Sequence, residues 1–214
     1  MLPEWTEAII CPIFKKGDKS EYQNYNVAHK ILARWIKSRL LKNMESIVGE
    51  YQSSFRRATT DQLFILREIQ AKSYEFEKET SPLFIDFKYV YDRVNRKEMY
   101  KALSELVIKE KLIRMMHLTL EMTKNRVRVK SRTSQKFKVG KGVRQGDPLS
   151  PVEFNLILNK IIREANINRT RLLYQKRHQC LAYVDDLVII SHSKKNLKKV
   201  VTRLEKKARG KGCR

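Results

Sequence analysis

The chain is poor in the residues that cross-link small folds or bind zinc, and it has no long apolar run. Its three cysteines, Cys11, Cys180 and Cys213, are widely spaced and odd in number, which matches neither a disulfide framework nor a zinc pattern. Buried or unused thiols in a reducing compartment are the simpler interpretation. No apolar segment is long enough to cross a bilayer, and the first residues lack the basic-then-apolar order of a secretory signal. We therefore expect no membrane partner.

Acidic residues are also few relative to basic ones, and the imbalance lies almost wholly in residues 81–214. The 214 residues include 46 Lys and Arg against 23 Asp and Glu, a net charge of +23. Residues 1–80 hold 13 basic and 11 acidic side chains, whereas residues 81–214 hold 33 and 12. An excess of this size attracts polyanions, and nucleic acid is the obvious one. A basic protein of membrane surfaces is the rival interpretation, but the sequence shows no long basic helix with an aromatic face.

An acidic pair interrupts an otherwise apolar segment. Asp185 and Asp186 separate residues 180–184 from 187–190, which we predict to be two strands of a hairpin. Two adjacent carboxylates repel each other and lose solvation next to buried strands, and a bound cation relieves both effects. A third carboxylate, Asp86, ends a strand predicted over 82–87; taken alone, it reads as an ordinary strand end or helix cap. Three carboxylates at strand ends suit Mg²⁺.

The spacing of apolar residues predicts several helices. They cover 30–47, Thr59 to about Glu79, roughly 96–123, about 150–164 and 194–209, whereas residues 1–30 read as irregular. In the second of these helices, Thr59 and Gln62 fit a capping box, and one side carries Leu63, Leu66, Ile69 and Phe76.

Basic and apolar residues alternate over 124–141. Period-two spacing places the charges on one face of a strand pair and the apolar residues on the other. No acid lies between Lys124 and Arg144. A phosphate-binding surface and a solvated edge both fit this pattern. The candidate nucleic-acid contacts are Arg126, Arg128, Lys130, Arg132, Lys136, Lys138 and Arg144.

Five motifs, in order along nearly the whole chain, resemble a known family. They are Trp-Thr-Glu-Ala-Ile-Ile-Cys-Pro-Ile-Phe-Lys-Lys-Gly-Asp-Lys at 5–19, Gly-Glu-Tyr-Gln-Ser-Ser-Phe-Arg at 49–56, Phe-Ile-Asp-Phe-Lys-Tyr-Val-Tyr-Asp at 84–92, Gly-Val-Arg-Gln-Gly-Asp-Pro-Leu-Ser-Pro at 142–151 and Tyr-Val-Asp-Asp at 183–186. The set resembles the reverse transcriptase domain of non-LTR (LINE-type) retrotransposons, most like the RTE-type group. An isolated Asp-Asp is a weak signal, whereas an ordered set of motifs is a strong one.

The resemblance implies an α+β fold of the right-hand polymerase type, in which helices back an antiparallel sheet. Residues 1–80 would form a fingers-like region and residues 81–214 a palm-like region. The implied activity is that of an RNA-directed DNA polymerase, a nucleotidyltransferase that adds dNTPs to a primer 3′-hydroxyl with two Mg²⁺ ions, or Mn²⁺ in their place. Asp86 and Asp185 would bridge the metals beside Asp186, with a backbone carbonyl near Phe87 as a further ligand. The implied partners are an RNA template and a DNA primer.

The resemblance also assigns residues around the nucleotide. Tyr91 would lie under the incoming sugar and exclude a ribose 2′-hydroxyl, although a tyrosine taken alone at this point is more often a core residue. Gln145 and Gly146 would position the nucleotide and the template base. Lys15 and Lys16 would reach the triphosphate, but an exposed turn is nearly as good an interpretation of these two lysines. Arg144 fits either a phosphate contact or a solvated charge.

Three departures from the family pattern bear on activity. A few residues, with an arginine that contacts the triphosphate in the family, are missing between Tyr25 and Val27, and a glycine is missing before Phe55. The chain also stops at Arg214, before the family's thumb. These departures keep a second interpretation open, that of a partial, catalytically inactive copy that only binds nucleic acid or has no selected role. The need to meet RNA and chromosomal DNA predicts an intracellular location, nuclear or cytoplasmic. The protein partners and the oligomeric state stay undefined.

Overall fold

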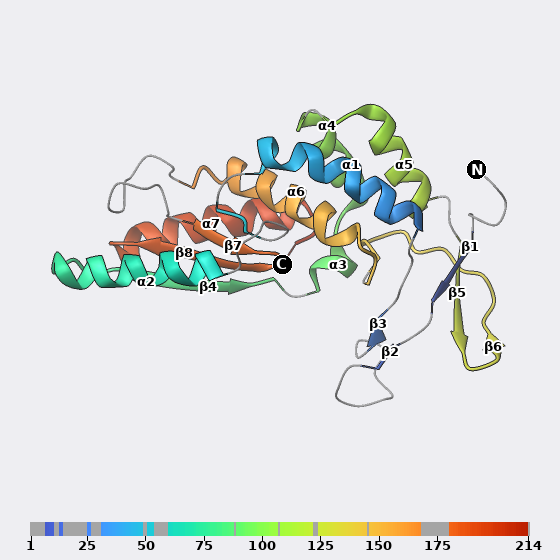
Figure 1. Cartoon of the computed structure of the whole chain (residues 1–214), viewed down its shortest axis with the longest axis horizontal. Coiled ribbons are helices and arrows are strands. Elements are labelled where there is room, and N and C mark those ends of the chain that lie inside the picture. Colours follow the sequence, from blue (N-terminus) through green and yellow to red (C-terminus); the bar gives the residue numbers. More distant parts are fainter. Residues whose placement is uncertain are drawn as a thin grey trace. The chain divides into compact units, whose positions relative to one another are not determined.

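A computed structural model of the chain provides the coordinates (Figure 1). The structure describes residues 7–10, 13–14, 25–26, 31–48, 51–53, 60–87, 89–106, 108–121, 124–144, 146–167 and 180–213. Two compact units divide the chain, and each combines two stretches that are distant in sequence. One unit comprises Met1–Ile47 with Tyr91–Glu153, and the other comprises Val48–Val90 with Phe154–Arg214. The expected division into residues 1–80 and 81–214 concerns functional regions and stays a prediction.

The second unit is built on a three-stranded antiparallel sheet of order β4-β8-β7. Its strands are β4 (Ser81–Asp86), β7 (Cys180–Tyr183) and β8 (Asp186–Ser191). β7 and β8 are neighbours in the chain, joined by the turn at residues 184–185, and β4 is hydrogen-bonded to β8. The strands predicted around the acidic pair and before Phe87 are therefore confirmed, with ends shifted by one residue.

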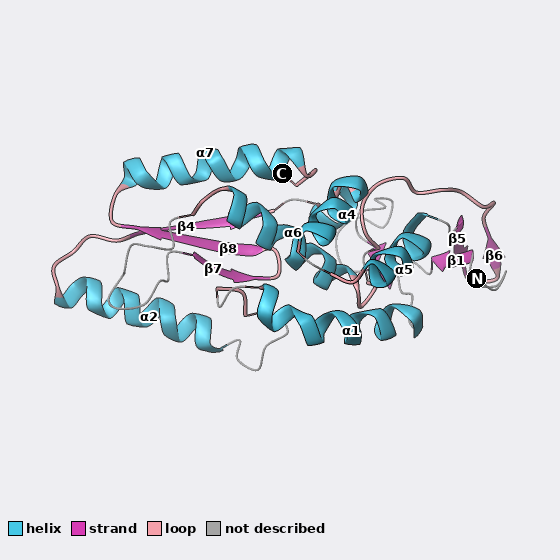
Figure 2. Cartoon of the chain, turned by 90° about the horizontal axis from the view of Figure 1, so that it is seen from above, coloured by secondary structure: helices cyan, strands magenta, loops and turns pink. Residues whose placement is uncertain are grey.

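Helices lie on both faces of this sheet, as Figure 2 shows for α2 (Thr60–Glu75) and α7 (Lys194–Gly210). α2 packs Ile65, Leu66 and Ile69 against Leu181, Val188 and Ile190. α7 contacts β4 and β8. Because side chains alternate between the faces of a strand, the residues at every second position from Val188 share the face that α2 covers. Asp186 is one of them.

The predicted end of α2 was wrong. The helix ends at Glu75 and not near Glu79, and only part of its apolar side is buried. Ile69 is buried, whereas Leu63 and Phe76 are 66% and 53% exposed. The apolar cluster with the sheet includes Ile65, Leu66 and Ile69 of the helix and does not include Leu63 or Phe76. Thr59 lies outside the described residues, and the Gln62 side chain donates a hydrogen bond to the carbonyl of Tyr51, 11 residues away.

The remaining helices lie in the first unit, apart from Val90 of α3 and residues 154–164 of α6, which belong to the second unit. The helices are α1 (Ile31–Ile47), α3 (Val90–Arg93), α4 (Arg96–Glu105), α5 (Glu110–Glu121) and α6 (Ser150–Glu164). The predictions for α1, α6 and α7 are confirmed to within a residue. The helical pattern predicted over roughly 96–123 corresponds to two helices, α4 and α5, which contact each other. The break lets both helices bury an apolar face.

Short strands complete the first unit and correct the expectation of an irregular N-terminal segment. They are β1 (Glu7–Ile10), β2 (Ile13–Phe14), β3 (Tyr25–Asn26), β5 (Lys124–Val129) and β6 (Arg132–Thr133). β1 runs parallel to β5, which also pairs with β6 in antiparallel orientation, and β2 pairs with β3. Periodicity did not reveal β1 because its partner lies more than a hundred residues further along the chain.

Two expectations from composition can be compared with the described residues. Cys180 and Cys213 are buried free thiols, as the interpretation of the cysteines predicted, and Cys11 lies outside the described residues. Within the described part of the chain, no helix combines the length and the apolar character needed to span a membrane.

Candidate active site and nucleic-acid contacts

The sheet of the second unit brings two of the three predicted catalytic carboxylates together. Asp86 is the last residue of β4 and Asp186 is the first residue of β8, and the two are direct partners in the antiparallel ladder. Directly opposed residues project from the same face, with Cβ atoms about 4.5–5.5 Å apart. Both side chains are exposed. Like charges in this position repel, so the ladder presents two acceptor groups that a cation would stabilise.

Asp185 lies in the hairpin turn, next to a strained residue. Val184, which precedes it, has a φ of +55°, a left-handed conformation that is unfavourable for a β-branched side chain. The Val184 amide donates a hydrogen bond to Oε1 of Gln52 at 3.3 Å. Strain of this kind is typical of functional turns, where the surrounding structure has to stabilise it. The turn is therefore held in an unusual conformation at the position of the acidic pair.

Gln52 also supports this site. It lies within the motif at 49–56, and the sequence indicated no role for it. Its side chain is buried, and Nε2 donates a hydrogen bond to Oδ1 of Asn155 at 3.2 Å. Its backbone segment adds to the sheet beside β7, since the Ala182 amide donates to the Tyr51 carbonyl at 2.7 Å and the Ser53 amide donates to the Ala182 carbonyl at 3.1 Å. The hairpin is thus fixed from its outer edge.

The donor chemistry of these residues fits a hard divalent cation such as Mg²⁺. Carboxylate oxygens at strand ends are the preferred ligands of such ions. Among the described residues, however, no three Asp, Glu, His or Cys side chains are arranged as a group that could hold a metal ion. Phe87 is buried, and its ring meets that of Phe154 edge to face with centroids 6.1 Å apart. The use of its carbonyl as a ligand and the joint action of all three carboxylates stay predictions.

The first unit contains Tyr91 and the segment before Gly146. The Val143 amide donates to the Tyr91 carbonyl at 2.6 Å, and the Gly142 amide donates to the Val94 carbonyl at 2.9 Å. Gly142 has a φ of +74°, and a Cβ atom there would lie 2.5 Å from the Tyr91 carbonyl oxygen. Only glycine fits this close approach. The segment predicted to position the nucleotide is therefore attached to the backbone of the residue predicted to lie under its sugar.

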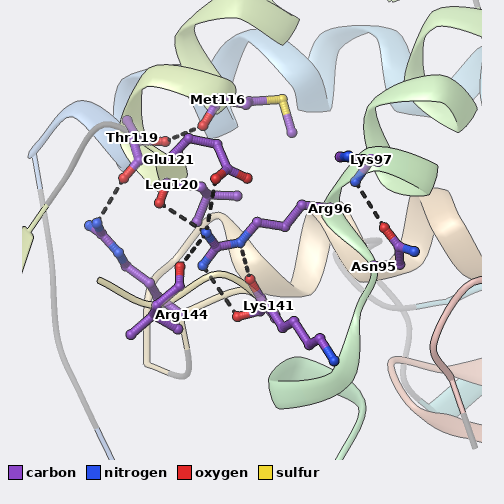
Figure 3. A network of polar contacts seen from close by, with 11 residues as sticks. Asn95, Arg96, Lys97, Met116, Thr119, Leu120, Glu121, Lys141 and Arg144 are labelled. Atoms are coloured by element: carbon purple, nitrogen blue, oxygen red, sulfur yellow. Dashed lines mark hydrogen bonds and ion pairs between the residues drawn. The ribbon is translucent and has the colours of Figure 1, made fainter. Parts of the chain in front are cut away.

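Arg96 also holds this segment, through the carbonyls of residues 139–142 (Figure 3). The side chain is buried, and it donates hydrogen bonds to four backbone carbonyls. The acceptors are Gly142 at 2.7 Å, Val139 at 2.6 Å, Lys141 at 3.3 Å and Leu120 at 3.1 Å. An ion pair to Glu121 at 3.6 Å adds to them. No sequence pattern indicates this role, because an arginine at the start of a helix is usually exposed.

Three ionisable side chains that follow Gly142 in the chain, Arg144, Asp147 and Glu153, have shifted pKa values. Arg144 is half-buried and donates a hydrogen bond to the Thr119 carbonyl at 2.7 Å, and burial lowers its pKa. Burial raises the pKa of Asp147, although the Leu149 amide and Arg144 oppose the change. Burial, together with the charge of Asp147, raises the pKa of Glu153 to about 8. Arg144 is thus no freely solvated charge, and its contact with phosphate stays a prediction.

The other predicted contacts are described in part. Lys15, Lys16 and Gln145 lie outside the described residues. Gly146 is exposed, in a turn with a φ of +83°. Arg126 is half-buried, whereas the remaining basic residues of 128–138 are exposed, namely Arg128, Lys130, Arg132, Lys136 and Lys138.

The strand pair predicted over 124–141 is only partly formed. β6 has two residues, and beyond it Phe137 alone bridges to Asn125. The apolar side chains Val129, Phe137 and Val139 are 57%, 40% and 41% exposed. The alternation therefore produces a largely solvent-exposed extension and not a sheet with one buried face.

Comparisons with known proteins identify the family of the chain. Residues 13–214 match the model of the family described as reverse transcriptase (RNA-dependent DNA polymerase). The chain is 26% identical over 121 residues to a retrovirus-related Pol polyprotein from type-1 retrotransposable element R2 of Nasonia vitripennis, which covers 56% of the chain and 12% of that protein. It is 25% identical over 195 residues to an R2 Pol polyprotein of Popillia japonica, which covers 87% of the chain and 27% of that protein. The resemblance to non-LTR retrotransposons is confirmed, and the RTE-like subtype stays a prediction.

Solved structures agree on the fold. Apo telomerase from Candida Tropicalis, truncated from its C-terminal domain, superposes with a TM-score of 0.69 at 16% identity over 94% of this chain and 46% of that chain. Telomerase from Candida albicans superposes with a TM-score of 0.61 at 14% identity over 85% of this chain and 32% of that chain. The predicted α+β architecture of polymerase fingers and palm is confirmed. The chain spans about a quarter or less of the curated relatives it matches, and it belongs to the reverse transcriptase (RNA-dependent DNA polymerase) family.

Proposed function

We propose that this chain is an RNA-directed DNA polymerase domain that adds dNTPs to the 3′-hydroxyl of a DNA primer paired with an RNA template. The observation that carries the proposal is the β4–β8 register, which places Asp86 directly opposite Asp186 at the edge of the hairpin that also holds Asp185. Family membership identifies the reaction for which such carboxylates are suited.

In this function, the carboxylates bind and orient two divalent cations, Mg²⁺ or Mn²⁺. Such ions, when bound, activate the attacking oxygen and stabilise the leaving pyrophosphate. Gln52 and Asn155 hold the hairpin so that Asp185 and Asp186 keep a fixed position. Tyr91 would select the sugar, and Gln145 and Gly146 would contact the nucleotide and the template. Lys15 and Lys16 would offset the charge of the triphosphate.

The basic extension around β5 and β6 would bind the backbone of the template and primer. Its exposed cations are spaced along a solvent-exposed segment, and phosphate neutralisation by such groups supplies sequence-independent affinity. A protein with these partners must reach RNA and chromosomal DNA, so we place it inside the cell, in the nucleus or the cytoplasm.

A second candidate function is nucleic-acid binding without polymerisation. It is favoured by the residues missing between Tyr25 and Val27, where the family has an arginine that contacts the triphosphate. The shortened segment still forms a strand, β3, which pairs with β2. The basic surface would keep its affinity for phosphates in this case, but no primer would be extended.

One assay separates the two candidates. The purified chain is given oligo(dT)-primed poly(rA), labelled dTTP and Mg²⁺, next to the double variant Asp185→Ala/Asp186→Ala. We expect incorporation by the unaltered chain and background incorporation by the variant, because the variant loses two of the three metal-binding carboxylates. Glu79→Gln is the matched control for loss of an exposed acid in the same unit, and it should keep full incorporation. Incorporation no greater than that of the double variant rejects the polymerase and leaves the binding function.

A further inference from the structure

Five cations form a continuous stripe along the exposed side of α7. They are Lys195, Lys198, Lys199, Arg203 and Lys206, and all five are exposed. The last four lie three, four, eight and eleven residues after Lys195. This spacing keeps all five on one side of a helix with 3.6 residues per turn. At 1.5 Å per residue the stripe is about 17 Å long. We name it the α7 stripe.

The opposite side of the same helix is the one that packs. Val200, Leu204 and Ala208 are buried, and α7 contacts β4 and β8. The apolar residues are therefore used within the fold, and no large hydrophobic side chain of α7 is exposed. A helix that lies in a membrane interface needs an exposed apolar face. The α7 stripe lacks one, which argues against a lipid surface as its partner.

The α7 stripe differs from the other cations of the helix in its pairing. Lys194 pairs with Glu79, Lys207 with Glu164 and Arg209 with Glu205, at 3.7–3.9 Å. None of the five stripe residues has an ion-pair partner within the part of the chain that the structure describes. Like charges at i, i+4, such as those of Lys195 and Lys199, destabilise a helix. An anionic partner would remove that repulsion.

The stripe is also separate from the carboxylates. Asp86 and Asp186 share the sheet face that α2 covers further along, whereas Figure 2 shows α7 on the opposite side of that sheet. Phosphates held by α7 would thus belong to a stretch of nucleic acid other than the primer end. Each strand of double-helical DNA has one phosphate per about 3.4 Å of helix axis, and phosphates of an extended single strand are spaced more widely, so a stripe of this length spans several phosphates of one strand.

We propose that the α7 stripe is a second phosphate-binding surface, which holds single-stranded RNA of the template away from the primer end. This inference rests on the proposed function, since it takes the template to be RNA that extends beyond the site of addition. The recognition is electrostatic and independent of sequence, because it uses backbone phosphates only.

Two matched triple variants test the proposal in the full chain. The stripe variant is Lys195→Gln/Lys199→Gln/Arg203→Gln, and the control is Lys194→Gln/Lys207→Gln/Arg209→Gln. Both remove two lysines and one arginine from the exposed side chains of the same helix, so they change the net charge equally. Fluorescence anisotropy with a labelled single-stranded RNA of mixed sequence measures the affinity over a series of salt concentrations, and circular dichroism checks folding.

The stripe variant should bind RNA at least tenfold more weakly at low salt, with a slope of log K against log salt that is shallower by about 2. The control should stay within twofold of the unaltered chain. Equal affinities of the two triple variants overturn the proposal, since the effect is then one of net charge alone. A loss of binding to anionic phosphatidylserine vesicles that exceeds the loss for RNA also overturns it, in favour of a membrane surface.

The primer-extension assay keeps this inference distinct from the proposed function. On a template with an overhang of only a few nucleotides, the stripe variant should extend the primer like the unaltered chain. If the stripe variant extends the primer fully and binds RNA as tightly as the unaltered chain, the proposal for the α7 stripe is rejected and the polymerase function stands. Absence of extension by the unaltered chain rejects the polymerase, whereas the RNA affinities still decide whether α7 binds phosphates.

Discussion

Replacing Arg96 with methionine is the sharpest test of how the first unit holds residues 139–142, which lead into the segment predicted to position the nucleotide. Methionine preserves the length and the apolar stem of the side chain, and it removes the guanidinium. The change deletes four hydrogen bonds to carbonyls, three of them in the stretch 139–142 and one at the end of α5. Methionine cannot replace the lost donors, because a thioether has no hydrogen to donate in a hydrogen bond.

The magnitude follows from the burial and the charge. A hydrogen bond that involves a charged group contributes about 1.5–3 kcal/mol, so the four together are large, but the cost of burying the guanidinium offsets much of their sum. Loss of one partner from a buried charged network costs about 3–5 kcal/mol, and we expect Arg96→Met to lower the free energy of unfolding by that amount. The ion pair to Glu121 is a minor part of it, since Glu121 is 31% exposed and the atoms are 3.6 Å apart.

Urea unfolding followed by far-ultraviolet circular dichroism measures the effect. With a slope of about 1–3 kcal/mol per molar urea, the midpoint should fall by about 2 M. Arg96→Lys keeps the charge but loses the planar fork, so its loss should lie between those of the methionine variant and the unaltered chain. Glu121→Gln is the control for the ion pair, and it should cost about 1 kcal/mol or less. A loss below 1 kcal/mol for Arg96→Met, or an equal loss for Glu121→Gln, refutes the role of the carbonyl bonds.

Two further predictions concern the same unit. Gly142→Ala should destabilise the chain by about 2 kcal/mol in urea unfolding, because its Cβ would lie 2.5 Å from the Tyr91 carbonyl oxygen at a positive φ; an unchanged midpoint would show that the segment can move away. Between its ordinary pKa of 4.5 and its raised value of about 8, Glu153 keeps a proton that the unfolded chain releases. The free energy of unfolding should therefore fall by about 1.4 kcal/mol for each unit by which the pH rises through that window. Glu153→Gln should flatten the fall, and an unaltered slope would contradict the assignment.

Local patterns were sufficient where the spacing of a segment's own apolar residues marks the element. The hairpin of β7 and β8 and the helices α1, α6 and α7 appear where the sequence predicted them. The ordered motifs also identified the family, because each of them is a short run of side chains. Arg144 shows the limit of such patterns, since its sequence neighbours left a solvated charge open, whereas the Thr119 carbonyl 25 residues away accepts its hydrogen bond.

Where the prediction failed, a distant partner decided the outcome. β1 forms because β5 is available to it. Leu63 and Phe76 are exposed because the sheet covers only a strip of α2, although the helical pattern alone makes them look like core residues. Gln52 and Arg96 are polar side chains whose importance comes from acceptors far along the chain, which no periodicity encodes.

The sequence by itself determined the family, the strongly basic character and the identity of the acidic residues, since these depend only on which side chains occur and in what order. The tertiary structure alone decided that Asp86 and Asp186 are paired, that Val184 is held in a left-handed turn and that five cations of α7 share one exposed side without an ion-pair partner among the described residues. Pairing between strands and burial of a helix face depend on groups brought together by folding, and their free energy is therefore absent from any local stretch of sequence.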